Sequence, residues 1–518
     1  MHPYLKYFPA RSENDNLDIV KLLYEGLNGD STRPLLAFEE EEWDVARIRR
    51  SVTALQCLFR DMGITTGDRV ALMLDNSPFH VACIYSLVLL GAVWIPLNTK
   101  LKSASIDYQL DHCRPKIVLV DHRYSEVLES ISGKYPGMTI LDSENLLEDH
   151  ESGADLLVND VGPECPLCII YTSGTTGAPK GVVFTHRMMR IASESARIVA
   201  NIRAGDRPFL WEPLCHIGGA QMLMVPILEP ACLVIVPSFS ASRFWTQIQD
   251  GKCTQLHYLG GILDILMHLP VPARSDRQTL RLAWGAGMSV SAWRPIRDRF
   301  LIEFRECYGM TEGASFATMN TANVPGSIGK PLPWLAVELL DESDAPVAVG
   351  KLGQVVISSE IEGNFFPGYL DDAHTTSQVL RNGKLYTGDM ARADSAGNLY
   401  FVGRKTESMR VRGENVSAWE IERVFLEHPD IASAAAIGVK SEIGEQEILL
   451  YIQWKENSSV SFPDLATWAR NRLASFQVPR YYQGIDRFEL TPSERIRKHM
   501  LSQDISGAWD RMSALKLA

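Results

Sequence analysis

The stretch CIIYTSGTTGAPKGVVFTH, residues 168 to 186, has an unusual run of hydroxyl, glycine and basic residues after an apolar segment. An apolar strand is expected to end at Tyr171. Hydroxyl and glycine residues follow as far as Gly177, before Lys180 and Gly181. Glycines let backbone N–H groups turn toward one anion, hydroxyls add donors, and a lysine supplies compensating charge. The stretch predicts a phosphate-binding loop rather than a plain surface turn. It is not a Walker A loop, because Gly181 stands where that loop has a magnesium-binding Ser or Thr.

Short apolar strands alternate with longer helical stretches on both sides of this loop. Helices are expected over residues 79 to 92 and in SASRFWTQIQ, residues 240 to 249. The alternation predicts an α/β fold with largely parallel sheets. The expected strands are 69–74, 93–97, 116–121, 232–237, 255–260 and 280–285.

The pattern changes after about residue 320, where Gly, Pro and alternating apolar residues predict antiparallel strands and turns. A last unit begins near Arg404. Ser417 and Glu420 have the spacing of a capping box at the start of a helix over 418–428. Strands over 431–439 and 447–454 and a helix over 462–473 complete a small α+β domain. We therefore expect an N-terminal domain of residues 1–403 and a C-terminal domain of residues 404–518.

The bulk composition excludes several classes of protein. A chain of 518 residues is too long for one core, so two or more domains are expected. The net charge of −12 argues against a nucleic-acid binder. The longest apolar run, residues 81 to 97, is interrupted by Gly91 and Pro96 and is interpreted as a buried helix and strand, not a membrane span. Nine scattered cysteines and the lack of an apolar signal segment favour the cytoplasm.

Further motifs support one family resemblance. The motifs YGMTE (308–312), YTGD (386–389), GNLYFVGR (397–404) and RGENVSAWEIE (412–422) follow the loop in this order. Together they resemble the adenylate-forming superfamily, which includes acyl-CoA synthetases, luciferases and peptide-synthetase adenylation domains. The resemblance covers about residues 30 to 505. The stretches FSASRFW, YLGGILDIL and RGENVS look most like the carnitine/crotonobetaine-CoA ligase branch.

The resemblance implies both a fold and a reaction. The fold is a large N-terminal domain of stacked, mostly parallel sheets with helices and a small β-barrel-like part, followed by a small mobile C-terminal domain. In the first half-reaction a carboxylate attacks the α-phosphate of ATP and releases pyrophosphate. A thiol, usually that of coenzyme A, then displaces AMP. The first step builds negative charge around phosphorus and so needs cations and hydrogen-bond donors aimed there.

The same resemblance assigns the residues that contact phosphate and metal. Glu312 would bind Mg²⁺, because a hard cation that bridges phosphates needs a carboxylate ligand. Thr311 would contact the α-phosphate. The loop residues would hold the β- and γ-phosphates, and these are Thr172, Ser173, Gly174, Thr175, Thr176, Gly177 and Lys180.

The nucleoside is assigned to a second set of residues. Tyr308, followed by Gly309, would stack on adenine. Asp389 would accept both ribose hydroxyls, since an ionised carboxylate is only an acceptor. Arg404 would reach the ribose or a phosphate. The backbone that would line the base belongs to Gly285, Ala286 and Gly287.

The acyl group and the thiol are expected to meet near WEPLCHIGGAQM, residues 211 to 222. His216 would lie near the substrate carboxylate and gate its tunnel. Considered without the motif, the same histidine would be interpreted as structural. Cys215 is interpreted as a small pocket wall. After a swing about the hinge at 405–407, where Thr406 departs from the usual charged residue, the 410–415 loop with Gly413 and Glu414 would approach the CoA thiol.

The segment TPSERIRK, residues 491 to 498, departs from the family pattern at its central position. Arg495 stands where the family has a catalytic lysine, with Leu501 in register. Lys498 is the alternative, and a surface basic residue is the third interpretation. A guanidinium is wider and planar, whereas an ammonium is a point charge. We expect adenylation to persist, slowed where Arg495 fits poorly, and thioester formation from supplied acyl-adenylate to be unaffected.

Three functions compete. The first is an acyl-CoA ligase for a small or medium carboxylic acid. The second is an adenylating enzyme that loads a carrier protein in trans. The third is a catalytically weakened nucleotide- or acyl-CoA-binding protein, motivated by Arg495 and Thr406. The partners expected are a small carboxylic acid and a further copy of the chain in a homo-oligomer.

Overall fold

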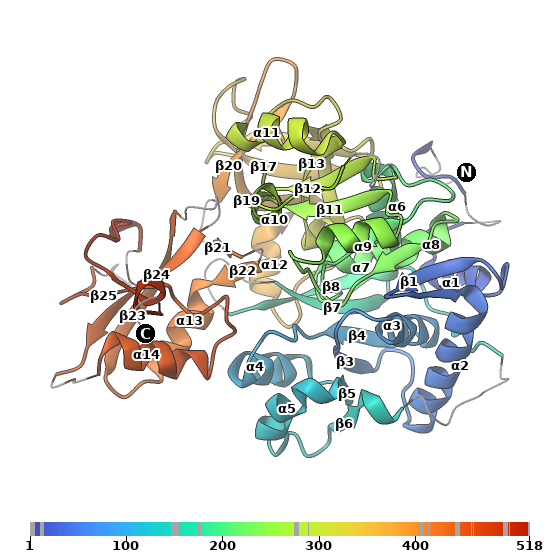
Figure 1. Ribbon diagram of the computed structural model, residues 1–518, viewed down its shortest axis with the longest axis horizontal. Coiled ribbons are helices and arrows are strands. Elements are labelled where there is room, and N and C mark those ends of the chain that lie inside the picture. Colours follow the sequence, from blue (N-terminus) through green and yellow to red (C-terminus); the bar gives the residue numbers. More distant parts are fainter. Residues whose placement is uncertain are drawn as a thin grey trace.

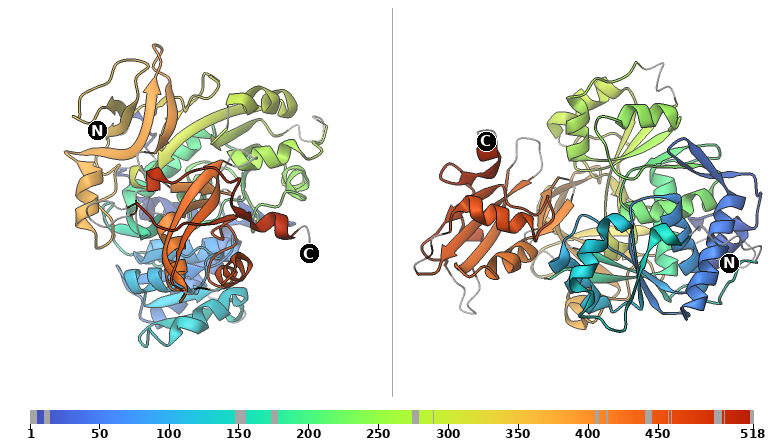
Figure 2. Two further views of the ribbon diagram at one scale, coloured as in Figure 1. Left: turned by 90° about the vertical axis from the view of Figure 1, so that its left-hand side faces the viewer. Right: turned by 60° about the horizontal axis from the view of Figure 1, so that its bottom comes forward.

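The computed structural model describes most of the chain. The residues described are 6–10, 15–146, 155–172, 178–273, 279–288, 290–404, 408–412, 414–440, 446–456, 458, 460–489, 496 and 498–515. They form a large N-terminal part and a smaller C-terminal part, which lie side by side (Figure 1). The right-hand view of Figure 2 shows the same two bodies meeting at one border.

A six-stranded sheet carries the ends of the expected phosphate loop. All neighbouring strands are parallel except β7 and β8, which form an antiparallel hairpin. The loops that follow β3, β4 and β5 share the carboxyl edge of this sheet, where ligands bind in open α/β sheets. Across the sheet the strands are β6 (Thr139–Asp142), β5 (Ile117–Val120), β3 (Arg69–Met73), β4 (Val93–Pro96), β7 (Pro166–Thr172) and β8 (Lys180–Thr185).

A nine-stranded sheet lies beside the first. Its central strands are parallel, and antiparallel strands close both edges. Across the sheet the strands are β15 (Lys330–Pro331), β14 (Ser315–Met319), β13 (Glu303–Met310), β12 (Leu282–Ala286), β11 (Gln255–Leu259), β9 (Pro208–Leu210), β10 (Leu233–Ile235), β1 (Pro34–Phe38) and β2 (Glu41–Asp44).

Helices pack on the faces of both sheets. The helix α3 buries nearly all of its residues, and it begins at a Ser77 cap followed by Pro78 and ends at the left-handed Gly91. Its side chains share one apolar core with residues of α6 and of both sheets. The longer helices of the N-terminal part are α1 (Ile19–Leu27), α2 (Val45–Asp61), α3 (Pro78–Leu90), α4 (Ser103–Cys113), α5 (Ser125–Ser132), α6 (His186–Val199), α9 (Phe244–Asp250), α10 (Gly260–Met267) and α11 (Val290–Phe300).

The N-terminal part ends in an antiparallel sheet of five strands, which is the small barrel-like part. The helix α12 (Ala373–Val379) lies next to it. The strands are β16 (Leu335–Leu340), β17 (Gly353–Ser359), β19 (Lys384–Ala393), β18 (Leu380–Arg381) and β20 (Leu399–Arg404). Because β20 ends at Arg404, the expected boundary between 403 and 404 falls at the end of a strand, and this boundary stays a prediction.

The C-terminal part is a small α+β unit. A hairpin of β21 (Ser408–Val411) and β22 (Glu414–Ser417) precedes α13 (Ala418–Leu426). A four-stranded sheet of β23 (Ile431–Lys440), β24 (Gln446–Trp454), β25 (Tyr481–Gly484) and β26 (Trp509–Asp510) packs against α13 and α14 (Phe462–Arg470). The predicted fold class is therefore confirmed.

Two helices differ from their expected bounds. The helix α9 begins at Phe244 rather than at 240, because residues 240–243 form a turn in which Arg243 N–H donates to the Ser240 carbonyl. The helix α13 ends at Leu426, two residues early. The reciprocal capping-box bond of Glu420 stays a prediction, and its carboxylate accepts a hydrogen bond from Gln477.

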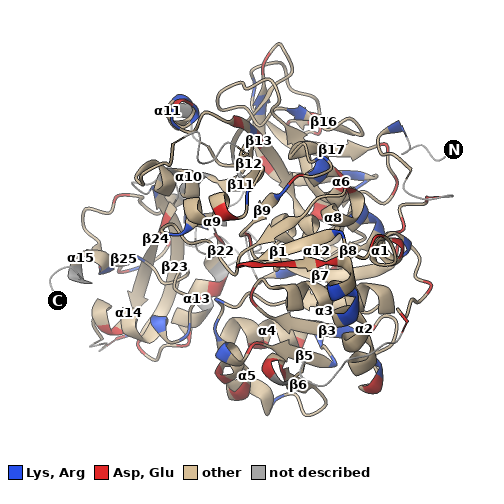
Figure 3. Ribbon diagram, turned by 45° about the vertical axis from the view of Figure 1, so that its right-hand side comes forward, with Lys and Arg blue, Asp and Glu red and all other residues tan. Residues whose placement is uncertain are grey.

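The lengths of the helices and the distribution of charge concern the whole molecule. None of the helices in the described ranges is long and apolar enough to span a membrane. Acidic and basic segments are interspersed along the ribbon (Figure 3). An anionic ligand therefore depends on local groups, and these are considered next.

Candidate active site

The hairpin of β7 and β8 holds the two ends of the expected phosphate loop. Thr172 ends β7 and lies opposite Lys180, the first residue of β8. The loop residues Ser173, Gly174, Thr175, Thr176 and Gly177 lie outside the described residues. The Lys180 ammonium lies 5.1 Å from the centre of the Tyr369 ring. Burial lowers the pKa of Lys180, and the charges of Asp372 and Glu312 oppose that shift.

The YGMTE segment brings a carboxylate next to this lysine. Thr311 and Glu312 are buried in a short 3-10 helix, η6 (Thr311–Gly313), directly after β13. The Tyr369 hydroxyl donates to Glu312 Oε1 over 2.7 Å. Gly309 permits the close approach of β13 to β14, because a Cβ there would lie 1.8 Å from the Ser315 carbonyl oxygen. The residues assigned to phosphate and metal are thus neighbours.

The residues assigned to the nucleoside also lie together. The Tyr308 hydroxyl donates to Asp389 Oδ2 over 2.7 Å. Asp389 on β19 lies opposite Arg404 on β20 in the antiparallel ladder. The expected base-stacking residue and the expected ribose acceptor are therefore joined by a hydrogen bond.

A buried carboxylate that the sequence analysis missed fixes the segment Gly285, Ala286 and Gly287. Glu306 Oε1 accepts the N–H groups of Gly287 over 2.6 Å and Met288 over 3.1 Å. The Tyr258 hydroxyl donates to Glu306 Oε2 over 2.5 Å. Burial raises the pKa of Glu306 to about 7. Its sequence signal was a glutamate within the strand, two residues before Tyr308.

The C-terminal part meets the N-terminal part through Glu414. Its Oε2 lies 2.9 Å from His216 Nε2, and its Oε1 accepts a hydrogen bond of 3.0 Å from the Lys100 ammonium. The Glu414 side chain is only 7% exposed. The β21–β22 hairpin therefore places a carboxylate between two cationic side chains. One of them belongs to residues 211–222, which we call the acyl segment because it was assigned to the acyl group. No sequence signal marked Lys100.

The groups at this contact shift each other's pKa values. Burial favours the neutral form of Glu414, but His216 and Lys100 outweigh it and lower the pKa of the carboxyl to about 2. Burial likewise disfavours the charged form of His216, but Cys215 and Glu414 raise the pKa of the imidazole well above its ordinary value. At neutral pH the contact is an ion pair between an imidazolium and a carboxylate.

Glu212, in the segment 211–222 that was assigned to the acyl group, forms a buried pair with a histidine of β11. His257 Nδ1 lies 2.8 Å from Glu212 Oε2. Trp211 stacks on the His257 ring and donates from Nε1 to its backbone carbonyl, and the Trp284 ring lies 4.3 Å from His257. Burial raises the pKa of Glu212, but His257 outweighs this and the net shift is downward. An ionised carboxylate thus lies among aromatic rings.

A cavity lies between the two parts. Its empty volume of about 490 Å³ includes space that is open to solvent. Residues of both parts line it. Its polar lining includes residues of the acyl segment, of α13 and of the β7–β8 hairpin, which we call the phosphate hairpin because it holds the ends of the expected phosphate loop. The polar lining residues are Asn98, Gln109, Tyr171, Thr172, Cys215, His216, Glu414, Glu420 and Gln477.

Several expected residues cannot be placed. Arg495, Gly413 and the hinge at 405–407 lie outside the described residues. Lys498, the alternative to Arg495, lies 2.5 Å from Glu422 within the C-terminal part. The alternative lysine is therefore paired with Glu422, and neither of these two residues lines the cavity.

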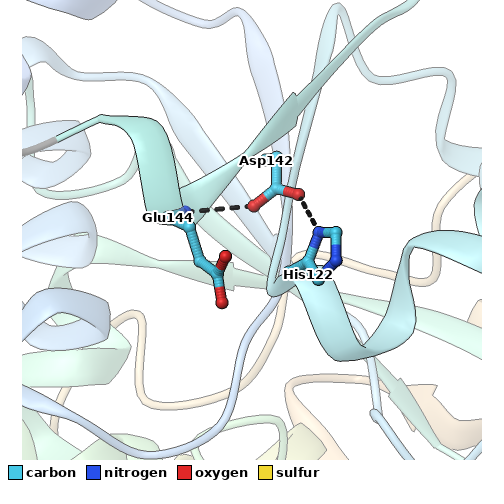
Figure 4. Close-up of side chains that lie close together, drawn as sticks. All are labelled: His122, Asp142 and Glu144. Carbon is cyan, nitrogen blue, oxygen red and sulfur yellow. Dashed lines mark hydrogen bonds and ion pairs between the residues drawn. The ribbon is translucent and has the colours of Figure 1, made fainter.

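One further cluster of metal-binding residue types occurs in the described ranges (Figure 4). Asp142 accepts hydrogen bonds from the Glu144 N–H over 3.0 Å and from His122 Nδ1 over 2.6 Å. His122 and Glu144 are exposed, and Asp142 caps the short helix that follows it. Local capping accounts for this geometry, and none of the three residues lines the cavity.

The fold and the order of the motifs define an adenylate-forming enzyme, and comparison with known proteins agrees. The chain belongs to the AMP-binding enzyme family, whose profile matches residues 26–370, and the AMP-binding enzyme C-terminal domain matches residues 420–495. The predicted superfamily is confirmed.

Individual relatives refine this picture. The crotonobetaine/carnitine–CoA ligase of Salmonella arizonae is 28% identical over 471 residues, which cover 86% of this chain and 90% of the relative. The structure of an o-succinylbenzoate CoA synthetase double mutant from Bacillus subtilis matches with a TM-score of 0.83 at 22% identity, covering 93% of this chain and 98% of that one. A Mycobacterium tuberculosis fatty acyl CoA synthetase matches with a TM-score of 0.70 at 24% identity, covering 94% and 98%.

Proposed function

We propose that the protein is an ATP-dependent acyl-CoA ligase. It converts a small carboxylic acid to an acyl-adenylate with release of pyrophosphate, and then transfers the acyl group to coenzyme A. The observation that carries this proposal is the contact of Glu414 with His216 and Lys100, beside a cavity that reaches the phosphate hairpin. The curated relatives, which are CoA ligases, support the same activity.

In the adenylation step, cations stabilise the charge that develops on phosphorus. Thr172 and Lys180 contact the β- and γ-phosphates from the two sides of the hairpin. Thr311 donates to the α-phosphate, and Arg495 bridges it to the substrate carboxylate. Tyr308 and Asp389 hold the adenine and the ribose.

The residues present fit a magnesium ion bound with the nucleotide. Glu312 is a buried carboxylate within the electrostatic reach of Lys180, and its Oε1 accepts a hydrogen bond from the neutral hydroxyl of Tyr369. Mg²⁺ prefers such hard oxygen ligands together with phosphate oxygens. When bound, the ion neutralises phosphate charge, and Glu312 is the residue that would hold it.

In the thioester step, the cavity admits the thiol arm of coenzyme A to the acyl-adenylate. The ion pair of His216 and Glu414 holds the C-terminal part against the acyl segment while the thiol attacks. The expected cytoplasmic location and the homo-oligomer remain predictions.

The proposal is tested by pyrophosphate release from ATP and Mg²⁺ across a panel of carboxylic acids, with and without CoA. The panel includes betaine-type acids, because Glu212 lies among Trp211, His257 and Trp284 and because the relative above is a crotonobetaine/carnitine–CoA ligase. Acid-dependent release that rises with CoA is expected. Release that responds to a carrier protein but not to CoA would favour the second function. ATP binding without release, even after acyl-adenylates are supplied, would favour the weakened binder.

A further inference from the structure

Two carboxylates line the cavity between the two parts of the molecule, and both come from the C-terminal part. Glu414 lies on β22, and Glu420 lies six residues further along the chain, in the first turn of α13. The opposite wall includes Thr172 of the phosphate hairpin and His216 of the acyl segment. Both carboxylates therefore face the space through which a thiol must reach the acyl-adenylate.

The two carboxylates have different partners. Glu414 contacts the cationic groups of Lys100 and His216. Glu420 Oε2 instead accepts a hydrogen bond of 2.8 Å from the neutral amide of Gln477. The amide is held in place because Gln477 is 1% exposed and its Oε1 accepts the Ala474 N–H over 3.2 Å.

Because their partners differ, the two carboxyl groups have different pKa values. The cations keep the pKa of Glu414 near 2, so it is ionised at any physiological pH. Burial raises the pKa of Glu420 to about 7, and the hydrogen bond from Gln477 offsets the rise only in part. Two carboxylates whose pKa values are driven apart in one site identify the group that exchanges protons. A group that titrates near the working pH is the more effective general base.

The other titratable groups that face the cavity do not serve as acceptors. The raised pKa of His216 keeps it protonated at neutral pH. Burial raises the pKa of Tyr171, so its hydroxyl stays protonated. Cys215 contributes a thiol next to His216. On the helix itself, Glu422 pairs with Lys498 at 2.5 Å and does not line the cavity.

We propose that Glu420 is the general base of the thioester step, a role that rests on the proposed function. The thiol sulfur attacks the acyl carbonyl carbon, and a C–S bond forms. The bond from that carbon to the phosphate oxygen breaks, and its electron pair leaves with AMP. The thiol proton moves to the Glu420 carboxylate and is later released to solvent. Gln477 positions the carboxylate toward the cavity.

The experiment measures the two half-reactions separately. Wild type and Glu420→Gln are first assayed for pyrophosphate release with the most active acid of the panel, which tests the proposed function alone. Each protein is then loaded with acyl-adenylate and mixed with CoA in a rapid-quench instrument between about pH 5.5 and 9, a range that spans the relevant pKa values. Pyrophosphate release is expected to be equal in the two proteins. Thioester formation in Glu420→Gln is expected to fall about 10²–10⁴-fold at neutral pH.

The pH profile distinguishes a base from a structural residue. The wild-type rate is expected to rise through an apparent pKa near 7. In Glu420→Gln that rise disappears, and the rate climbs only toward the pKa of the free thiol, about 8.5. Gln477→Lys introduces a cation beside the carboxylate and is expected to move the profile about 1–3 pH units to the acid side.

Glu422→Gln, two residues along the same helix, is the matched control and is expected to behave as wild type. An unchanged thioester rate and profile in Glu420→Gln would overturn the proposal while leaving the proposed function intact. Equal loss of both half-reactions in Glu420→Gln would also overturn it, since the residue would then act on the whole fold.

Discussion

At the residue scale, Glu414 connects the two parts of the molecule. Sequence analysis placed Glu414 in the loop that approaches the thiol and His216 at the acyl group, and the structure brings these two side chains to 2.9 Å. It could not identify Lys100, because nothing in the local pattern after β4 marks one lysine as the partner of a residue 314 positions away. Such pairs depend on tertiary contacts, which local periodicity does not encode.

Glu414→Gln tests this contact. The amide cannot neutralise both Lys100 and His216, which are 49% and 37% exposed, so screening by water limits the loss. We expect thioester formation to fall about fivefold, in line with about 1 kcal/mol for partly exposed pairs, and pyrophosphate release to stay unchanged. Stopped assays of the two half-reactions measure both effects. The exposed Glu427→Gln is the matched control, and an equal effect in both variants would refute the role of the contact.

Arg495 is the second residue whose assignment can be tested directly. Arg495→Ala removes the cation proposed to bridge the carboxylate and the α-phosphate, so pyrophosphate release is expected to fall about 10²–10³-fold. Thioester formation from supplied acyl-adenylate should be unaffected. Lys498→Ala, whose lysine pairs with Glu422, serves as the control. Unchanged pyrophosphate release in Arg495→Ala would show that the assignment is wrong.

At the element scale, the sequence predicted the strand that precedes the expected phosphate loop and the buried helix α3, because glycines and apolar runs are local signals. It did not predict the order of strands in the two large sheets, which is set by contacts between distant segments. It also missed Glu306 of β13, whose three hydrogen bonds reach Tyr258 of β11 and the N–H groups of Gly287 and Met288, directly after β12. The segment at 285–287, which was assigned to adenine, is therefore held by a side chain from a neighbouring strand.

Gly309→Ala tests the close approach of β13 and β14 beside η6. The added Cβ would lie 1.8 Å from the Ser315 carbonyl oxygen, so the backbone must move and displace Thr311 and Glu312. We expect a loss of about 1–3 kcal/mol in the free energy of unfolding and a marked loss of pyrophosphate release. Denaturant titration measures the first effect. Gly133→Ala, where no atom lies within 4 Å of the new Cβ, should retain full stability and activity.

At the scale of the whole molecule, the docked arrangement is expected to depend on pH. Cys215 and the docked Glu414 raise the pKa of His216, so the contribution of the Glu414 contact to docking is complete below about pH 6.5 and is lost as pH rises through the raised value. The pKa of Glu414 is lowered to about 2, so its contribution is present above about pH 4.3 and is lost as pH falls toward 2. Docking should be strongest between about pH 4.5 and 6.5.

Small-angle scattering across this range measures the docked population. The radius of gyration is expected to increase as pH rises above the window, because the two parts separate. His216→Gln removes the titrating group and should abolish the alkaline change. A radius that varies with pH identically in wild type and His216→Gln would assign the effect to another group.

The central claim is that one active site makes an acyl-adenylate and passes its acyl group to coenzyme A. The most direct test quantifies pyrophosphate, AMP and acyl-CoA in one reaction with the most active acid of the panel. The account predicts that the three products form in equal amounts and that AMP release requires CoA. Pyrophosphate and AMP formed without any acyl-CoA, in the presence of excess CoA, would contradict it.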